Sequence, residues 1–518
     1  MAMYNTLYAD ETLYLEEPYM TEAQSADPFH ISAGRIATFF IFGLVICSLS
    51  GIRDVSAPMF IAARGLLAFI LLVSILAPSR FGVPLFFLVL LVSTDIIQSS
   101  SEQVVYGEYN IASVWRLFVG PIRPSWIVFG ASLILLAKNW TFFVDRRVKL
   151  AIIWFVTVPI FTGILYGGFR TFARSVEVPA DIRLGLLLIT SILLFVSFIR
   201  RNPDKLSLLL AVFIGGLLAV HLRDVIIWFL GRGPLLGGVS RASVDSAKST
   251  IVFVLLFGIY LIIKRGRIFL GTIITLASLL LVIVFATRMI WLTSAFCCML
   301  LVYLLGAKRL LIAVPVVLIL TFGTWKLIKS VQITSLDVVT RRAQSFSTEG
   351  GGNYLSRLAP LRYAEFINSS NTNFKRFAFL WGSGYGGYYT EEAAPFPHVL
   401  IDAHPEYAAS TGQFFYCHNY VFHMLFKHGI IGFIIISLLW LGPAWVCYKY
   451  VFNRGDPSMF NGILACILAF VPNAMLNLYW TGKGLLINGF IIAVLIVVAE
   501  LYSSPAEEMS ELETEQAD

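Results

Sequence analysis

The chain has 518 residues, of which 58% are hydrophobic and only 13% are charged, and its mean hydropathy is +0.79. No soluble fold buries so much apolar surface, and apolar stretches of roughly 18–22 residues recur, the length that crosses a hydrocarbon core of about 30 Å. The formal net charge of +7 suits the basic cytoplasmic loops of a membrane protein, so we expect no nucleic-acid partner. Composition therefore excludes a soluble protein and predicts an all-α, polytopic protein embedded in a lipid bilayer.

The apolar runs predict a helical bundle of about 12–14 transmembrane helices with one long extracytoplasmic loop. We assign spans in chain order at residues 33–52, 59–77, 82–98, 121–138, 149–168, 182–199, 206–230, 249–263, 268–286, 289–306, 310–328, 430–448, 461–480 and 484–502.

Basic residues in every second loop set the predicted orientation. If the N-terminus is inside, the short inner loops carry clusters such as Arg146–Arg147 and Arg200–Arg201, as the positive-inside rule requires. Both termini then lie in the cytoplasm. The predicted parts are a cytoplasmic tail (1–30), a bundle of about eleven spans (31–328), a periplasmic loop (329–417), a His-motif helix with the last three spans (418–502) and an acidic cytoplasmic tail (503–518).

Arginines on the predicted outer side run against the positive-inside trend and so suggest an anionic partner. Arg288 stands at the outer edge of a span, where it either snorkels to the headgroups or faces a cavity. A guanidinium suits phosphate because its fork makes two parallel hydrogen bonds. In the outer loop, the candidates for the same role are Arg342, Arg357 and Arg362. The alternative is that they lie on a solvated loop face, and this alternative is weakest for Arg357.

His418 is the predicted catalytic base, because an imidazole titrates near neutrality and this one stands at the start of a membrane helix. The alternative is an interfacial histidine satisfied by the backbone. Asn419 follows it, and Gly429 and Gly432 fit a close helix contact. The glycine segment with Gly382 and Gly384 either lets backbone N–H groups approach a phosphate or makes a tight turn. Five histidines lie between 398 and 428, but none have the i, i+4 spacing of a helical zinc site, so we predict no metal and no cofactor.

These residues together resemble the bacterial O-antigen ligase and O-antigen polymerase superfamily. Its hallmark is a His followed by Asn, Ser or Arg, nine further residues and Gly-x-x-Gly, which His418–Asn419, Gly429 and Gly432 match. The family also has a Ser-Arg-Gly-like triplet, a periplasmic-loop arginine before a helix, and a Gly-x-Gly segment. Thr287–Arg288, Ser356–Arg357 and Gly382–Ser383–Gly384 occupy those places.

Two features depart from the family pattern. Met289 replaces the usual small residue after the arginine of the triplet, and fourteen spans exceed the dozen common among ligases. The resemblance covers roughly residues 250–450, and the first 200 residues add little to it beyond hydrophobicity.

The resemblance implies a GT-C-like, metal-independent glycosyltransferase on the outer face of the bacterial inner membrane. Its donor would be a glycan on undecaprenyl diphosphate, and its acceptor a sugar hydroxyl on lipid A core, a growing glycan or a protein. His418 would take the acceptor proton, while Arg288 and Arg357 stabilise charge on the leaving diphosphate. Arg342, Arg362, Gly382 and Gly384 would help bind that diphosphate, and a chain-length regulator is a possible partner.

Two functions therefore remain open. The first is a polymerase or ligase of envelope polysaccharide, with the polymerase slightly favoured by span count and by the aromatic, arginine-rich outer loop. The second is a transporter or flippase for an anionic solute or lipid-linked glycan, which would use the same arginines in a binding cavity. Against it, the sequence shows no inverted repeat and no matched pair of broken helices.

Overall fold

A computed structural model of the chain describes residues 31–50, 57–94, 113–116, 124–141, 146–155, 157, 178–229, 235–236, 239–240, 248–284, 288–306, 360–396, 411–415, 417, 419–454, 458–477 and 481–503. Three of the predicted site residues, His418, Arg342 and Arg357, lie outside the described residues. Arg288 is described only as part of a helix backbone. Arg362, Asn419 and the four motif glycines are described in full.

The described chain is almost wholly helical, as predicted. Its only strands are Leu235–Leu236 (β1) and Val239–Ser240 (β2), which pair antiparallel. The long helices are α1 (Ala33–Ser50), α2 (Ala57–Leu76), α3 (Ser79–Val92), α5 (Pro124–Asn139), α7 (Val178–Arg201), α8 (Leu206–Phe229), α9 (Ile251–Arg265), α10 (Ile268–Val284), α11 (Arg288–Leu304), α15 (Pro360–Lys375), α17 (Tyr420–Arg454), α18 (Met459–Asn477) and α19 (Gly482–Ser503).

Within the described residues, six helical stretches are long and apolar enough to cross a membrane: 58–76, 181–201, 203–226, 420–451, 459–477 and 482–501. Four more apolar helices are shorter. This confirms an all-α, polytopic membrane protein. The span predicted at 310–328 lies outside the described residues, and the count of fourteen stays a prediction. Most boundaries of the described helices differ from the predicted ones by a few residues, and α17 starts at Tyr420, ten residues before the predicted 430.

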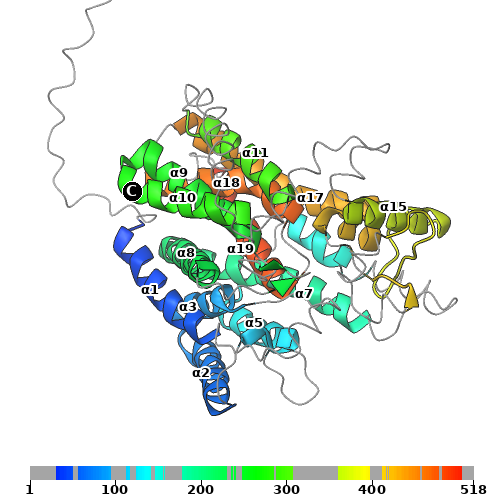
Figure 1. Cartoon of the computed structure of the whole chain (residues 1–518), viewed down its shortest axis with the longest axis horizontal. Helices are drawn as coiled ribbons and strands as arrows, with labels where there is room; N and C mark the ends of the chain where they lie inside the picture. Colours follow the sequence, from blue (N-terminus) through cyan, green and yellow to red (C-terminus); the bar gives the residue numbers. More distant parts are fainter. Residues whose placement is uncertain are drawn as a thin grey trace, which may run out of the picture.

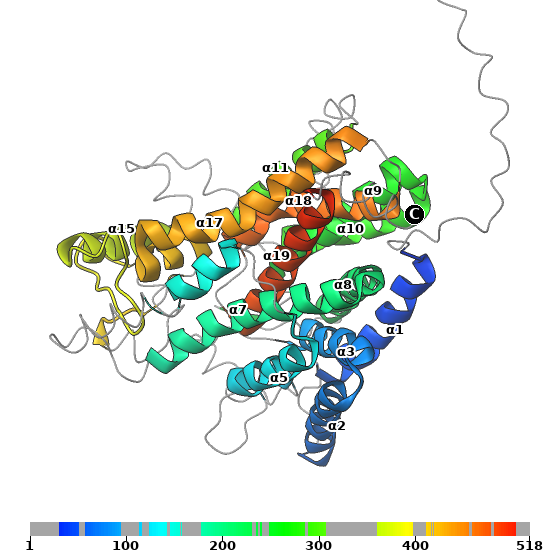
Figure 2. The ribbon, with the colours of Figure 1, turned by 180° about the vertical axis from the view of Figure 1, so that it is seen from behind.

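The helices form two groups joined by a central helix (Figures 1 and 2). α1, α2, α3 and α8 pack on one side, and α9, α10, α11 and α18 on the other. Between them α19 packs on both α7 and α17. Its apolar window is 89% buried, against 22% for α2, so α19 is a core helix whereas α2 presents an apolar face outward.

Aromatic rings hold the centre of the bundle. Phe87 of α3 lies 4.9 Å from Phe195 of α7 and 4.5 Å from Phe490 of α19, measured between ring centroids. Phe213 of α8 stacks on the same group. Such edge-to-face and tilted pairs contribute beyond their buried area, so four helices share one packed layer.

The helix ends gather into two opposite ends of the molecule. At one end, which we call the Arg200 end, Arg200 of α7 pairs with Glu500 of α19. There Arg201 donates to the Lys138 carbonyl at 2.6 Å, and Lys138 in turn donates to the last carbonyls of α2. These are the ends that the sequence predicts on the cytoplasmic side. The opposite ends carry the polar groups described next.

Candidate functional site

The helix α17 is broken at Gly429, where φ is 65° and ψ is −169°. In a regular helix the N–H groups of Ile430 and Ile431 would bond to the carbonyls four residues earlier. Here they donate to the carbonyls of Phe379 and Leu380, at 3.1 and 3.0 Å.

The carbonyls that the break releases are satisfied by the segment that contains Phe379 and Leu380. Phe426 O accepts from Ser383 N at 2.7 Å, and Lys427 O accepts from Gly384 N at 3.0 Å. Residues 379–384 therefore replace the missing helix bonds one for one. A broken helix at membrane depth is tolerated only when its backbone groups find partners in the protein, which this segment supplies.

The motif glycines make this insertion sterically possible. A Cβ on Gly382 would collide with the backbone of Lys427 and His428, and one on Gly429 would collide with the Leu380 carbonyl. Gly432 lies equally close to Trp154. The amides of Gly382 and Gly384 donate to backbone carbonyls of the chain itself, a different use from the phosphate cradle that we predicted. Diphosphate binding by these glycines stays a prediction, and their observed role is close packing.

A buried ion pair locks the glycine segment and α7 onto α17. Lys427 Nζ donates to Asp181 Oδ2 at 2.6 Å and to Gly387 O at 2.9 Å. The same carboxylate oxygen accepts from Gly386 N at 2.8 Å. The Lys427 side chain is only 1% exposed. Because a buried charge needs both a counter-charge and hydrogen bonds, the three elements are held in one arrangement.

Asn419, next to the predicted base, caps the start of α17. Its Oδ1 accepts from Val421 N at 2.9 Å, which satisfies one of the helix N–H groups that lack an internal partner. Its Nδ2 donates to Leu476 O of α18 at 3.0 Å. The motif asparagine therefore fixes the beginning of α17 against the last turn of α18.

The last turn of α18 also binds the first turns of α11. Thr293 of α11 lies 2.9 Å from Asn473 Oδ1 and accepts from Asn477 Nδ2 at 2.8 Å. Asn473 Nδ2 donates to Ser249 O at 3.0 Å, just before α9. Arg288, the first residue of α11, is five residues before Thr293, a rise of about 7.5 Å. Asn419, which follows His418, and Thr293, which lies five residues after Arg288, thus contact the same last turn of α18.

A second group of polar residues, outside our predicted site, lies beside these contacts at the start of α9. His221 of α8 contacts Thr250 at 3.0 Å. Its neighbour Arg223 donates to Asp224 Oδ1 at 3.0 Å and to Thr94 Oγ1 at 2.8 Å. Lys483 at the start of α19 is 1% exposed and donates to Ser93 O at 3.1 Å. The sequence indicates this group by ionisable residues near the ends of apolar runs, because such residues usually face the interior of a helix bundle.

The helix α15 brings an arginine and a carboxyl group to the start of α17. It runs parallel to the first part of α17: the rings of Phe366 and Phe422 pack at a tilt with their centroids 4.9 Å apart, and Asn373 Nδ2 donates to Phe426 O at 3.1 Å. Figure 2 shows the two helices side by side. Arg362 pairs with Glu365 at 3.2 Å.

Glu365 is fully buried, and burial raises its pKa from 4.5 to about 7, while Arg362 opposes the shift. Burial raises the pKa of the Cys417 thiol, and the Glu365 carboxylate raises it further. Glu365 therefore lies close to Cys417, the residue that precedes His418. Arg362, one of the predicted diphosphate ligands, thus stands beside the start of α17, paired with Glu365. Sequence reasoning missed Glu365, since a lone glutamate in a polar stretch carries no pattern.

Asn419 and Arg362 of the predicted site lie near the start of α17, together with the last turn of α18 and the first turns of α11 and α15; we call this region the α17 entrance. The four motif glycines lie farther along, at the break in α17. Among the described residues, no three His, Cys, Asp or Glu side chains are grouped closely enough to hold a metal ion. No protein-family model matches this chain, and no curated protein is significantly similar to it in sequence.

Proposed function

We propose that the protein is a membrane glycosyltransferase of the O-antigen ligase and polymerase type, which transfers an undecaprenyl-diphosphate-linked glycan to a sugar hydroxyl. The observation that carries the proposal is the convergence at the α17 entrance. Asn419 and Thr293 bond to the same turn of α18, and they flank His418 and Arg288 in the sequence.

The proposal is that the base and the first cation lie close together. It is supported by the sequence positions of His418, which is adjacent to Asn419, and of Arg288, which is about one and a half turns from Thr293. An imidazole placed there would take the acceptor proton, a contribution of about 10²–10⁴-fold to the rate. The acceptor oxygen would then attack the anomeric carbon and expel the lipid diphosphate, with inversion at that carbon.

Negative charge grows on the departing diphosphate, and fixed guanidinium groups would stabilise it. Arg357 comes three residues before α15, whose first turns lie at the α17 entrance. Arg288 and Arg357 in a partly water-excluded site would each contribute about 3 kcal/mol to transition-state stabilisation. The diphosphate linkage already stores the driving force, so the transfer uses no nucleotide. Polymerisation and ligation share these steps and differ in the acceptor.

The broken helix α17 is the one observation that favours a transporter, because discontinuous helices line the substrate sites of many secondary transporters. In those sites, the released backbone groups face the ligand. Here residues 379–384 satisfy four of the released groups: Phe426 O, Lys427 O, Ile430 N and Ile431 N. Transport of the donor across the membrane is therefore the competing function that the experiment below distinguishes.

The test is glycan transfer in vesicles that contain the full chain and a lipid-linked oligosaccharide donor. His418→Ala should abolish transfer and leave donor binding intact, because it removes the base alone. Arg288→Lys should be at least about 100-fold slower, since a point charge does not reproduce the two parallel bonds of guanidinium. His404→Ala, a histidine of the same stretch outside the motif, is the matched control. Normal transfer by His418→Ala would overturn the proposal, and loss of donor passage across the membrane in that variant would indicate a transporter.

A further inference from the structure

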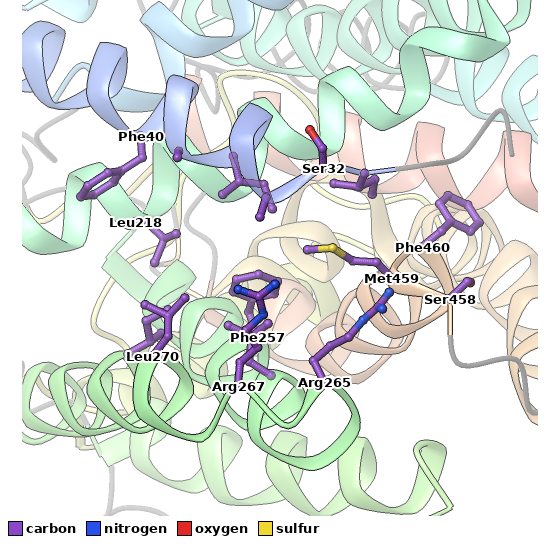
Figure 3. A pocket seen from close by; sticks show the side chains of 16 residues that line it. Ser32, Phe40, Leu218, Phe257, Arg265, Arg267, Leu270, Ser458, Met459 and Phe460 are labelled. Carbon is purple, nitrogen blue, oxygen red and sulfur yellow. The ribbon is translucent and has the colours of Figure 1, made fainter. Parts of the chain in front are cut away.

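A cavity of about 620 Å³ lies at the Arg200 end of the bundle, away from the α17 entrance (Figure 3). It is bounded by the start of α1, the end of α9, the start of α10 and the start of α18. Arg35 of α1 donates to Ser207 at 3.2 Å, which places the start of α1 beside the turn that follows Arg200 and Arg201. The cavity has the volume of a small-molecule pocket, about 300–1,000 Å³.

Its lining divides into an apolar interior and a basic edge. Phe40, Leu218 and Phe257 lie along the interior, whereas Arg265 and Arg267 are exposed at the edge. Figure 3 shows Arg265 extending toward Met459 and Arg267 rising beside Phe257. The sixteen residues that line the cavity include no Asp or Glu, so the two cations have no counter-charge within that lining.

Arg265 is held in place by a neighbouring tyrosine, and the chain turn places Arg267 beside it. Arg265 Nε donates to Tyr260 Oη at 3.0 Å, and the Tyr260 ring is clamped against Gly462 of α18. This contact uses only the Nε edge of the Arg265 guanidinium group. Gly266, with φ of 59°, turns the chain between the two arginines and so brings Arg267 to the same rim.

The edge of the cavity continues into outward-facing apolar surface. On α10, Leu270 is 49% exposed and the preceding Phe269 is 81% exposed. On α1, the lining residues Ala33 and Ala37 are themselves exposed. In a membrane protein such surface contacts lipid chains, so the cavity is reached from the bilayer, at the depth where headgroups meet basic residues.

We propose that this cavity binds one anionic phospholipid, with an acyl chain among Phe40, Leu218 and Phe257 and the phosphate on Arg265 and Arg267. The interior matches a hydrocarbon chain in polarity, and the forked guanidinium groups match phosphate oxygens in geometry. Basic pockets between membrane helices on the cytoplasmic side are suited to anionic headgroups for the same electrostatic reason. The site is separate from the proposed transfer chemistry and does not depend on it.

Native mass spectrometry of the full chain, titrated with phosphatidylglycerol or phosphatidylcholine, tests the proposal. The wild type should retain one phosphatidylglycerol in preference to phosphatidylcholine. Arg265→Ala with Arg267→Ala should weaken that binding about 30-fold, since each cation near a headgroup accounts for about fivefold. The control pair Arg146→Ala with Lys149→Ala removes two exposed charges elsewhere and should bind as the wild type does.

A second pair of variants tests the acyl-chain part. Ala37→Phe fills the cavity and should also weaken binding, whereas Thr38→Phe, one residue along α1 and outside the lining, should not. Equal retention of both lipids, or unchanged binding in the double arginine variant, would overturn the proposal. Competition by inorganic phosphate alone would assign the arginines to a soluble anion, and a crosslink from the cavity to residues 1–30 in lipid-free protein would assign it to the chain's own N-terminus. Either result would also overturn it.

Discussion

Gly429 carries both a left-handed backbone and a contact that leaves no room for a side chain. Any other residue at φ of 65° is strained, and a Cβ here would also meet the Leu380 carbonyl and Gly382 N. The motif glycine is therefore explained by the insertion of residues 379–384, independent of any bound ligand.

Gly429→Ala should consequently lower stability by about 3 kcal/mol or more, from the strained φ together with the collision with rigid backbone. The melting temperature in detergent is the measurement. Gly130→Ala is the control, because it lies inside α5 with no atom within 4 Å of the added Cβ. That variant should melt at the wild-type temperature or slightly higher. Equal melting of the two variants would contradict the packing role of Gly429.

Glu365 gives the fold a dependence on pH. Its pKa is about 7 in the folded protein and 4.5 as a free side chain, because burial disfavours the charged form. The folded state therefore binds the Glu365 proton more tightly than the unfolded state does. The stability that this proton contributes is complete below pH 4.5 and is lost as the pH rises through about 7. The loss amounts to about 3 kcal/mol, at about 1.4 kcal/mol for each pKa unit.

We expect the melting temperature of the wild type to fall between pH 5 and pH 8 more steeply than that of Glu365→Gln, which stays neutral throughout. The comparison needs only purified protein and a set of buffers. Glu391→Gln, the same change at a half-buried position, is the matched control. If Glu365→Gln and the wild type show the same dependence of melting temperature on pH, the Glu365 carboxyl is not the titrating group.

At the level of elements, α17 is stabilised by contacts with segments distant in the sequence. Residues 379–384 replace its missing hydrogen bonds, α18 receives the Asn419 side chain, and Asp181 of α7 neutralises Lys427. Isolated from these partners, the first part of α17 would lack both its cap and its counter-charge. The break is therefore a joint between the helix bundle and residues 379–384.

Removal of either partner of the Lys427–Asp181 pair should destabilise this joint by about 3–5 kcal/mol, because it leaves a buried charge unpaired. Asp181→Asn retains an acceptor for Gly386 N, so it isolates the loss of charge. The double variant with Lys427→Met should recover part of the loss, and melting curves of the four proteins give the coupling energy.

The exposed Lys375–Glu392 pair is the control for that cycle, since both side chains are more than half exposed. Lys375→Met should change stability by less than about 1 kcal/mol. Purely additive losses at Lys427 and Asp181 would contradict the joint that we describe.

For the molecule as a whole, the helix ends separate into the Arg200 end and the α17 entrance, and the basic loops predict that the former faces the cytoplasm. Ala393→Cys on the outer segment should then react with a membrane-impermeant maleimide in intact cells. Asp204→Cys, near the Arg200 end, should react only after the membrane is opened. Of the native cysteines, five are buried and Cys298 is partly buried, so background labelling should be low. The reverse pattern would place the proposed site inside the cell and remove its lipid-linked donor.

The sequence alone determined the membrane class, the helical fold and the approximate positions of the described apolar helices, because hydrophobic length and composition are local properties that each segment carries by itself. It also singled out Asn419, Gly429 and Gly432 by their spacing. Only the tertiary structure decided that Asn419 caps α17, that the glycines admit a backbone segment, and that Lys427 meets Asp181. Those contacts join residues up to 246 positions apart. No local pattern encodes such a pairing, since it depends on how the whole bundle packs.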